Sequence, residues 1–336
     1  MTKFAKLSLT AFVLIGMSAT AGTLEDTKKQ GFVKCGVDGG LPGFSEVVSG
    51  GVYKGIDVDG CKAIAASVLG DASKVKYVAL NAKERLAALQ SGEIDILVRN
   101  TTWTQTRDTS LGLNFAGVNY YDGQGFMIRK NLGVKSALEL NGASVCIQTG
   151  TTTELNVADY FRANNMTYKT VAYDTNDQVI QSYENGRCDI LTSDASQLYG
   201  LRTKLKDKAN HIVLPEIISK EPLGPVVRQG DDAWFNIVKW SFYAMVAAEE
   251  AGITSKNADE MLKSNNPEIK RILGTEGKMG ANLGLNADFA YQIIKQVGNY
   301  GEVFERNVGT STPLNIERGL NALWSKGGLQ YSPPFR

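Results

Sequence analysis

The sequence from Asp95 to Arg107 reads DILVRNTTWTQTR, and the organisation of the whole chain can be worked out from it. It begins with a short apolar run, typical of a buried strand, and becomes polar within a few residues. The polar part carries the amide of Asn100, the hydroxyl of Thr102 and the guanidinium of Arg107. Because open α/β sheets hold their ligands at the carboxyl ends of their strands, we expect a binding site at this edge.

A second copy of the pattern occurs further along the chain. The sequence GEIDIL at residues 92–97 is matched by GRCDIL at residues 186–191. Asn100 lies five residues after the aspartate of the first copy, and Asp194 lies five residues after the aspartate of the second. This repetition predicts two similar α/β units whose polar strand ends face each other.

Bulk composition narrows the class of protein. The chain has 336 residues, which is enough for two domains, with 43% hydrophobic and 21% charged residues. The formal net charge of +1 gives no basic field, so we expect no nucleic-acid partner. Residues 1–21 combine Lys3 and Lys6, an apolar centre and a final Ala-Thr-Ala, which predicts a signal peptide cleaved near Ala21. We therefore expect an exported protein.

Four cysteines in an exported chain favour disulfide bonds, for which three connectivities exist. Because each predicted unit contains two of them, we expect the pairs Cys35–Cys61 and Cys146–Cys188. Zinc is the competing interpretation, but the sequence has no CxxC and a single histidine, His211, so no metal is expected.

Local patterns predict further elements around these landmarks. Thr151 with Glu154, and Thr175 with Gln178, have the spacing of helix capping boxes. The expected strands and helices include strands at 32–37, 75–80, 144–148 and 226–228, and helices at 57–69, 83–90 and 232–250.

Three groups form a candidate site for a zwitterion. Arg107 can bind a carboxylate through two hydrogen bonds, and the helix start at residues 150–152 offers free backbone N–H groups to an anion. Asp194 would balance an ammonium group. Each also has a purely structural explanation: a surface ion pair for Arg107, a helix cap for 150–152, and a turn for Asp194. Phe44, in a glycine-bounded loop, either covers the apolar part of the ligand or belongs to the core.

The chain resembles the periplasmic solute-binding proteins of the polar amino-acid class, in particular the binding component of general L-amino-acid ABC transporters. The stretches that carry this resemblance are KCGV (34–37), GIDVDGC (55–61), LNAKER (80–85), LQSGEID (89–95), RNTTWT (99–104), YYDGQGF (120–126), GTTTEL (150–155), PEIISKEP (215–222) and GLNALW (319–324).

The resemblance implies a two-lobed α/β fold of the type II periplasmic-binding-protein kind. Lobe one would comprise residues 22–121 and 219–336, and lobe two residues 126–214. The chain would cross between the lobes at hinges near 122–125 and 214–219, and the tail would pack on lobe one.

The resemblance also implies roles for the site residues. Arg107 would clamp the α-carboxylate of an amino acid, assisted by backbone N–H groups of Thr102 and Thr152, with Thr151 in the same turn. Asp194 would take the α-ammonium group, together with the Thr102 hydroxyl and the carbonyl of Asn100.

The function implied is that of a monomeric periplasmic receptor that binds free L-amino acids broadly, including glutamate, glutamine, aspartate and asparagine. It would deliver them to the permease subunits of an ABC importer and would need no cofactor. Two alternatives remain open: a ligand-sensing module for a membrane receptor, and a catalytic derivative such as a dehydratase. Arg99 would either favour acidic ligands or form a surface ion pair, and we expect the ion pair.

Overall fold

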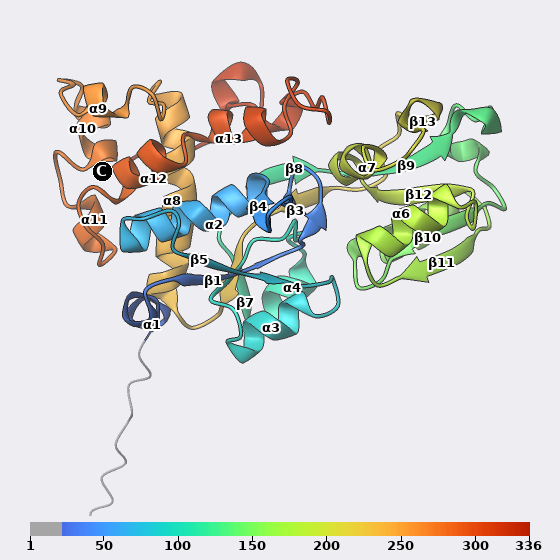
Figure 1. The fold of residues 1–336 in the computed structure, drawn as a ribbon, viewed down its shortest axis with the longest axis horizontal. Helices are drawn as coiled ribbons and strands as arrows, with labels where there is room; N and C mark the ends of the chain where they lie inside the picture. Colours follow the sequence, from blue (N-terminus) through green and yellow to red (C-terminus); the bar gives the residue numbers. More distant parts are fainter. Residues whose placement is uncertain (1–21) are drawn as a thin grey trace, which may run out of the picture.

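The computed structural model describes residues 22–336, so the predicted signal peptide lies outside the described residues. Two five-stranded sheets lie side by side along the long axis of the molecule (Figure 1). The first lobe is built on the sheet β5 (Val75–Ala79), β1 (Val33–Val37), β6 (Ile96–Leu97), β15 (Val226–Arg228) and β7 (Leu113–Phe115). The second lobe is built on the sheet β11 (Lys169–Tyr173), β10 (Ser144–Gln148), β12 (Ile190–Asp194), β9 (Gln124–Arg129) and β13 (His211–Val213).

Both sheets share one plan. In each, the strand that lies second in the sheet is parallel to both of its neighbours: β1 to β5 and β6, and β10 to β11 and β12. The other two strands of each sheet pair antiparallel with their neighbours: β15 with β6 and β7, and β9 with β12 and β13. The predicted two-lobed α/β fold is confirmed.

Helices cover the sheets of both lobes. Those of the first lobe are α1 (Thr23–Gln30), α2 (Ile56–Leu69), α3 (Arg85–Ser91), α4 (Gln105–Ser110), α8 (Asp232–Glu250), α9 (Ala258–Met261), α10 (Pro267–Leu273), α11 (Met279–Asn282), α12 (Phe289–Gln296) and α13 (Tyr300–Asn307). Those of the second lobe are α5 (Thr152–Ala163), α6 (Asn176–Glu184) and α7 (Ala195–Arg202). Short 3-10 turns are η1 (Lys130–Leu132), η2 (Ala137–Glu139), η3 (Lys208–Asn210), η4 (Gly319–Asn321) and η5 (Trp324–Lys326).

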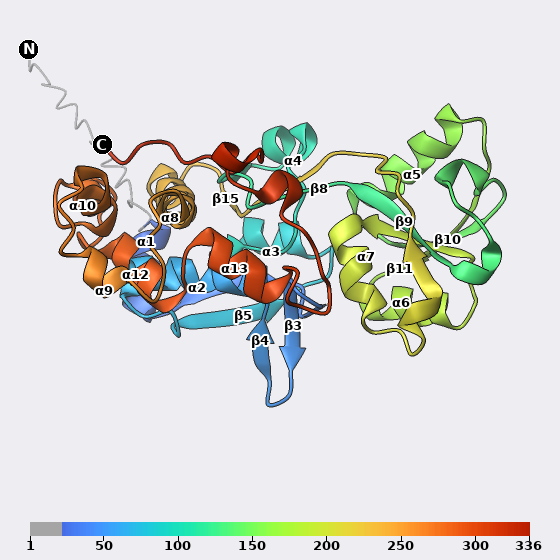
Figure 2. The ribbon, with the colours of Figure 1, turned by 90° about the horizontal axis from the view of Figure 1, so that it is seen from above.

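The C-terminal helices belong to the first lobe. Helix α12 packs against α2 and α8, and α9, α10 and α12 lie at the end of the molecule away from the second lobe (Figures 1 and 2). A small sheet of β2 (Gly40–Leu41), β3 (Ser45–Val48) and β4 (Val52–Lys54) projects from the same lobe (Figure 2). Within residues 22–336, no helix is both long enough and apolar enough to cross a membrane.

Two antiparallel strands stand where the chain passes between the lobes. They are β8 (Tyr120–Asp122), which precedes β9, and β14 (Glu221–Leu223), which follows β13. Beside them the Ile218 amide donates to the carbonyl of Gln124 over 2.8 Å. The two segments therefore run together between the sheets.

The sequence repeat has the same structural role in both lobes. Asp95 Oδ2 accepts the backbone N–H of Lys34 at 2.8 Å, and Asp189 Oδ2 accepts that of Ser144, also at 2.8 Å. Each aspartate thus secures the start of the strand that lies second in its sheet, β1 or β10. Both predicted disulfides, Cys35–Cys61 and Cys146–Cys188, are confirmed.

One capping prediction is confirmed and the other is wrong. Thr175 and Gln178 form a complete capping box. The Thr151 hydroxyl instead donates to the Gln148 carbonyl (2.7 Å), and Glu154 accepts the N–H of Gly150 (2.7 Å). The turn before α5 thus uses both side chains, and Thr151 makes no cap hydrogen bond to the helix.

Candidate functional site

The polar strand ends of the two lobes meet between the sheets. Thr102 follows β6 of the first lobe, and Thr152 is the first residue of α5 in the second. Their hydroxyl oxygens lie 3.4 Å apart, and both hydroxyls donate to Oε2 of Glu221, at 2.5 and 2.8 Å. The polar groups that follow β6 in the first lobe therefore meet the helix start that follows β10 in the second.

Arg107 supplies the positive side of the site. It lies on the short helix α4, is 9% exposed, and donates from Nη1 to the carbonyl of Thr102 at 2.9 Å. Burial lowers the pKa of its guanidinium, and the negative charges of Glu221 and Asp194 act in the opposite direction. The surface alternative for Arg107 is therefore wrong, because the residue is buried between acids of the site.

Asp194 supplies the negative side. It ends β12, is 4% exposed, and accepts a hydrogen bond from Gln197 Nε2 at 2.8 Å. Burial raises the pKa of its carboxyl group well above the ordinary value, and the neighbouring carboxylates of Asp122 and Glu221 raise it further. A cation bound beside these acids would relieve their repulsion.

Asn100 has a strained backbone at the end of the first-lobe strand. Its φ is +31°, uncommon for a residue other than glycine, and its Oδ1 is buried without a hydrogen-bond partner among residues 22–336. The backbone N–H of Asn100 donates to the buried carboxylate of Asp57 at 3.1 Å. Burial raises the pKa of Asp57 to about 7. Strain of this kind is typical of functional sites.

The start of α5 keeps donors available. Thr151 lies at the N-cap position without making a cap hydrogen bond, so its side chain leaves the first N–H groups of the helix uncapped. Helix N-termini with free N–H groups favour anions. Because the capping prediction for Thr151 is wrong, these N–H groups stay available, and this supports the prediction that the helix start binds an anion.

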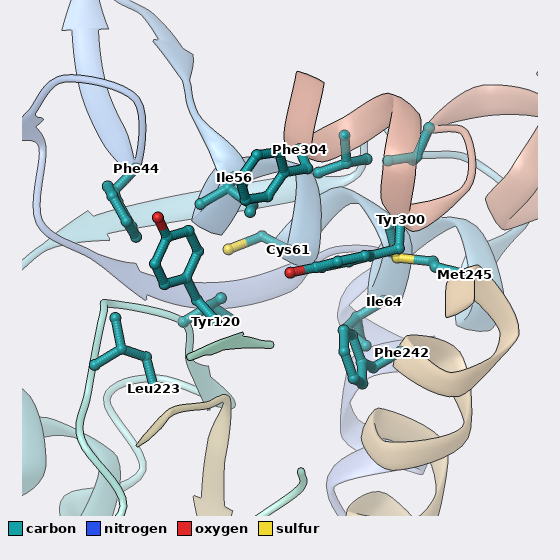
Figure 3. Close-up of a cluster of buried hydrophobic side chains, with 14 of the residues drawn as sticks. Phe44, Ile56, Cys61, Ile64, Tyr120, Leu223, Phe242, Met245, Tyr300 and Phe304 are labelled. Atoms are coloured by element: carbon teal, nitrogen blue, oxygen red, sulfur yellow. The ribbon is translucent and has the colours of Figure 1, made fainter. Parts of the chain in front are cut away.

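Two other sequence-predicted residues lie elsewhere. Phe44 is 0% exposed and packs edge-on against Tyr120, with ring centroids 5.2 Å apart (Figure 3). It belongs to the core cluster, so it offers no surface for a ligand in this arrangement. Arg99 forms an ion pair, with Asp38, but the expected surface position is wrong because Arg99 is 1% exposed and also donates to the Leu80 carbonyl.

Sequence reasoning missed a buried arginine near the site. Arg85 begins α3, is 2% exposed and donates from Nη1 to the Arg99 carbonyl at 3.1 Å. Its Nε has no partner among residues 22–336. Burial lowers its pKa well below the ordinary value, while Asp38 and Asp194 raise it. The rest of α3 is rich in leucine and alanine, which predicts a helix. This pattern gave no signal that the arginine at its start points inward.

Comparison with known proteins identifies the fold family. Residues 33–272 match the family described as bacterial extracellular solute-binding proteins, family 3. The chain belongs to this family.

Several members of this solute-binding family are similar over nearly their whole length. The general L-amino acid-binding periplasmic protein AapJ of Rhizobium johnstonii is 60% identical over 329 residues, which is 97% of this chain and 96% of that protein. The glutamate/glutamine/aspartate/asparagine-binding protein BztA of Rhodobacter capsulatus is 56% identical, covering 99% and 98%. The structure of an ABC transporter periplasmic binding protein from Brucella ovis with glutathione bound matches with a TM-score of 0.93. It is 57% identical and covers 94% of this chain and 100% of that one.

Proposed function

We propose that this protein is the periplasmic binding component of an ABC importer for L-amino acids, including glutamate, glutamine, aspartate and asparagine. The observation that carries the proposal is the pair of opposite charges between the lobes: buried Arg107 on α4 and buried Asp194 at the end of β12. A free amino acid carries the complementary pair of charges. The names of its relatives at 56–60% identity support the same ligand class.

The α-carboxylate binds Arg107 in this proposal, with help from the backbone N–H groups of Thr102 and of Thr152 at the start of α5. The α-ammonium group binds Asp194, the Thr102 hydroxyl and the Asn100 carbonyl. Both poles are then satisfied inside a buried site, which favours binding because an unpaired buried charge is costly.

The ligand side chain extends toward Arg85 in this proposal. Its unpartnered Nε can donate to a carboxylate or to an amide carbonyl, which suits acidic and amide amino acids alike. A cavity of about 260 Å³ lies between the lobes nearby, lined by residues that include Asp38 and Gln148. None of the proposed ligand contacts lines this cavity, but two of its lining residues contact neighbours of the site: Asp38 pairs with Arg99, and the Gln148 carbonyl accepts from Thr151.

Closure of the lobes would present the loaded protein, as a monomer, to the permease subunits. We place the hinges at residues 122–125 and 214–219, beside the β8–β14 pair. Export through residues 1–21 would bring the protein to the periplasm. We infer binding without catalysis: His211, the single histidine of the chain, is hydrogen-bonded to the Tyr183 hydroxyl at 2.8 Å within the second lobe.

Calorimetry on protein stripped of ligand by unfolding and refolding tests the proposal. The panel is the twenty L-amino acids, the D-enantiomers of the acidic and amide members, and glutathione. We expect tight binding of L-glutamate, L-glutamine, L-aspartate and L-asparagine, weak binding of the D-forms, and mass spectra that show each ligand unchanged. Failure of every L-amino acid to bind would contradict the proposal. A chemically altered ligand would show that the protein is an enzyme.

A further inference from the structure

A single carboxylate is shared by the two lobes. Glu221 is the first residue of β14 and is 1% exposed. Its Oε2 accepts the hydroxyls of Thr102 and Thr152, at 2.5 and 2.8 Å. Its Oε1 accepts the amide of Asn156 at 2.6 Å and the hydroxyl of Ser219 at 2.7 Å. Four donors therefore occupy the roughly four acceptor positions of the carboxylate.

These donors come from different parts of the fold. Thr102 belongs to the first lobe, whereas Thr152 and Asn156 lie on α5 of the second. Glu221 itself is paired with Asp122 in the small sheet between the lobes. The carboxylate is thus held at the crossing point while each lobe supplies donors to it. Separation of the lobes has to break its bonds to at least one of them.

We propose that Glu221 is a positioning residue that stabilises lobe closure through protein contacts alone and holds the Thr102 and Thr152 side chains in place for binding. The positioning part rests on the proposed function, because it assigns those threonines to the ligand site. The closure part does not, since the bonds to Glu221 join protein side chains of the two lobes and need no ligand atom. Charge-assisted hydrogen bonds shielded from water are the strongest of their kind, which suits this role.

Of the other polar contacts between the lobes, the bond from Asn176 Nδ2 to Asp38 Oδ2 (3.2 Å) is also sheltered, whereas two more are exposed. Lys83 pairs with Asp174 at 2.6 Å, but their side chains are 53% and 56% exposed. Lys204 of α7 donates to the Gly40 carbonyl at 2.6 Å, in an exposed position. Water and salt weaken such contacts, so they contribute less to closure than the buried carboxylate.

Single-molecule FRET on the full mature chain tests the proposal. Dyes are attached through non-canonical residues at the exposed positions Val52 in the first lobe and Leu138 in the second, which leaves both disulfides intact. Glu221→Gln preserves shape but removes the charge and one acceptor oxygen. Asn156→Ala removes a second-lobe donor and places a good helix former in α5. Lys83→Ala removes the exposed ion pair and is the matched control.

Without ligand, we expect a populated closed state in the unsubstituted protein. The ratio of closed to open molecules should be about tenfold lower in Glu221→Gln. It should decrease less in Asn156→Ala and change little in Lys83→Ala. With saturating L-glutamate, all four proteins should close, and the ligand should leave Glu221→Gln about tenfold faster. A wholly open ligand-free protein, or equal closed fractions in Glu221→Gln and Lys83→Ala, would overturn the proposal. If no amino acid binds, the proposed function fails, but the ligand-free distances still decide the role of Glu221 in closure.

Discussion

The two lobes share a scaffold and differ in the charge at its tip. Each has a strand flanked by two parallel strands, one disulfide, and an aspartate that secures the start of that strand. The first lobe presents Arg107 on α4, the helix that follows β6, and the second presents Asp194 at the end of β12. In the proposed function each lobe would therefore recognise half of a zwitterion, and the site would be complete only where the lobes meet.

The lobes also differ in what covers them. The helices from α8 to α13 belong to the first lobe, where α8, α12 and α13 pack against α2. Asn321 of η4 extends this layer to the crossing strand β8: its side chain accepts from the Tyr121 N–H (2.7 Å) and donates to the Tyr121 carbonyl (3.0 Å). The first lobe thus carries an additional helical layer that the second lacks among the described residues. The following changes test how far the two lobes are equivalent.

Removal of either charge pole should have the largest effect. Arg107→Ala and Asp194→Ala should each weaken amino-acid binding by about 2–5 kcal/mol, because one ligand charge is left buried and unpaired. Calorimetry measures the loss, with Lys83→Ala as the control that should bind normally. Near-normal affinity in both variants would show that the poles do not hold the ligand.

Removal of the disulfides should destabilise both lobes to a similar degree. The bridges close 26 and 42 residues, so replacing each pair by alanine should lower the free energy of unfolding by about 3–4 kcal/mol, slightly more for Cys146–Cys188. Urea unfolding followed by hydrogen exchange measures both the size and the place of the loss. Exchange that increases equally in both lobes for either variant would show that the lobes do not unfold separately.

The repeated aspartates should differ in importance. Asp95 is buried and also accepts from Gln30, whereas Asp189 is exposed. Asp95→Ala should lower the free energy of unfolding by about 2–3 kcal/mol and Asp189→Ala by about 1 kcal/mol. Chemical denaturation of the two variants, each compared with its asparagine counterpart, gives both numbers. Equal losses would mean that burial does not distinguish the lobes here.

Acidic pH should weaken binding gradually. Burial raises the pKa of Asp122 to about 6 and that of Asp194 well above its ordinary value, and a bound ammonium group would lower both again. Binding therefore releases protons when these groups are protonated, so affinity should fall as the pH drops through the range in which they become protonated, which for Asp122 lies near 6. The decrease should be at most about tenfold per pH unit for each proton released. Calorimetry in buffers of different ionisation enthalpy measures the protons, and no release at pH 5 would contradict this assignment.

Much of the scaffold follows from local patterns in the sequence. The helix at 232–250 has the predicted bounds, and the 92–97 and 186–191 repeats predicted the facing strand ends. The site was only partly predictable. Arg107, Thr102, Thr152 and Asp194 are grouped as expected, but Phe44 is in the core and Arg99 is buried.

By itself the sequence determined the local features of this protein. These are the segments that form strands and helices, the places where strands end in polar groups, and the cysteines that share a lobe. These depend on neighbours a few residues away. Only the tertiary structure decided that Arg85 lies inside the protein and that Glu221 joins Thr102 to Thr152, since these contacts link residues 14, 119 and 69 positions apart. Packing of the whole chain decides which side chains are buried and which donors share one carboxylate. No pattern of neighbouring residues in the sequence predicts these contacts.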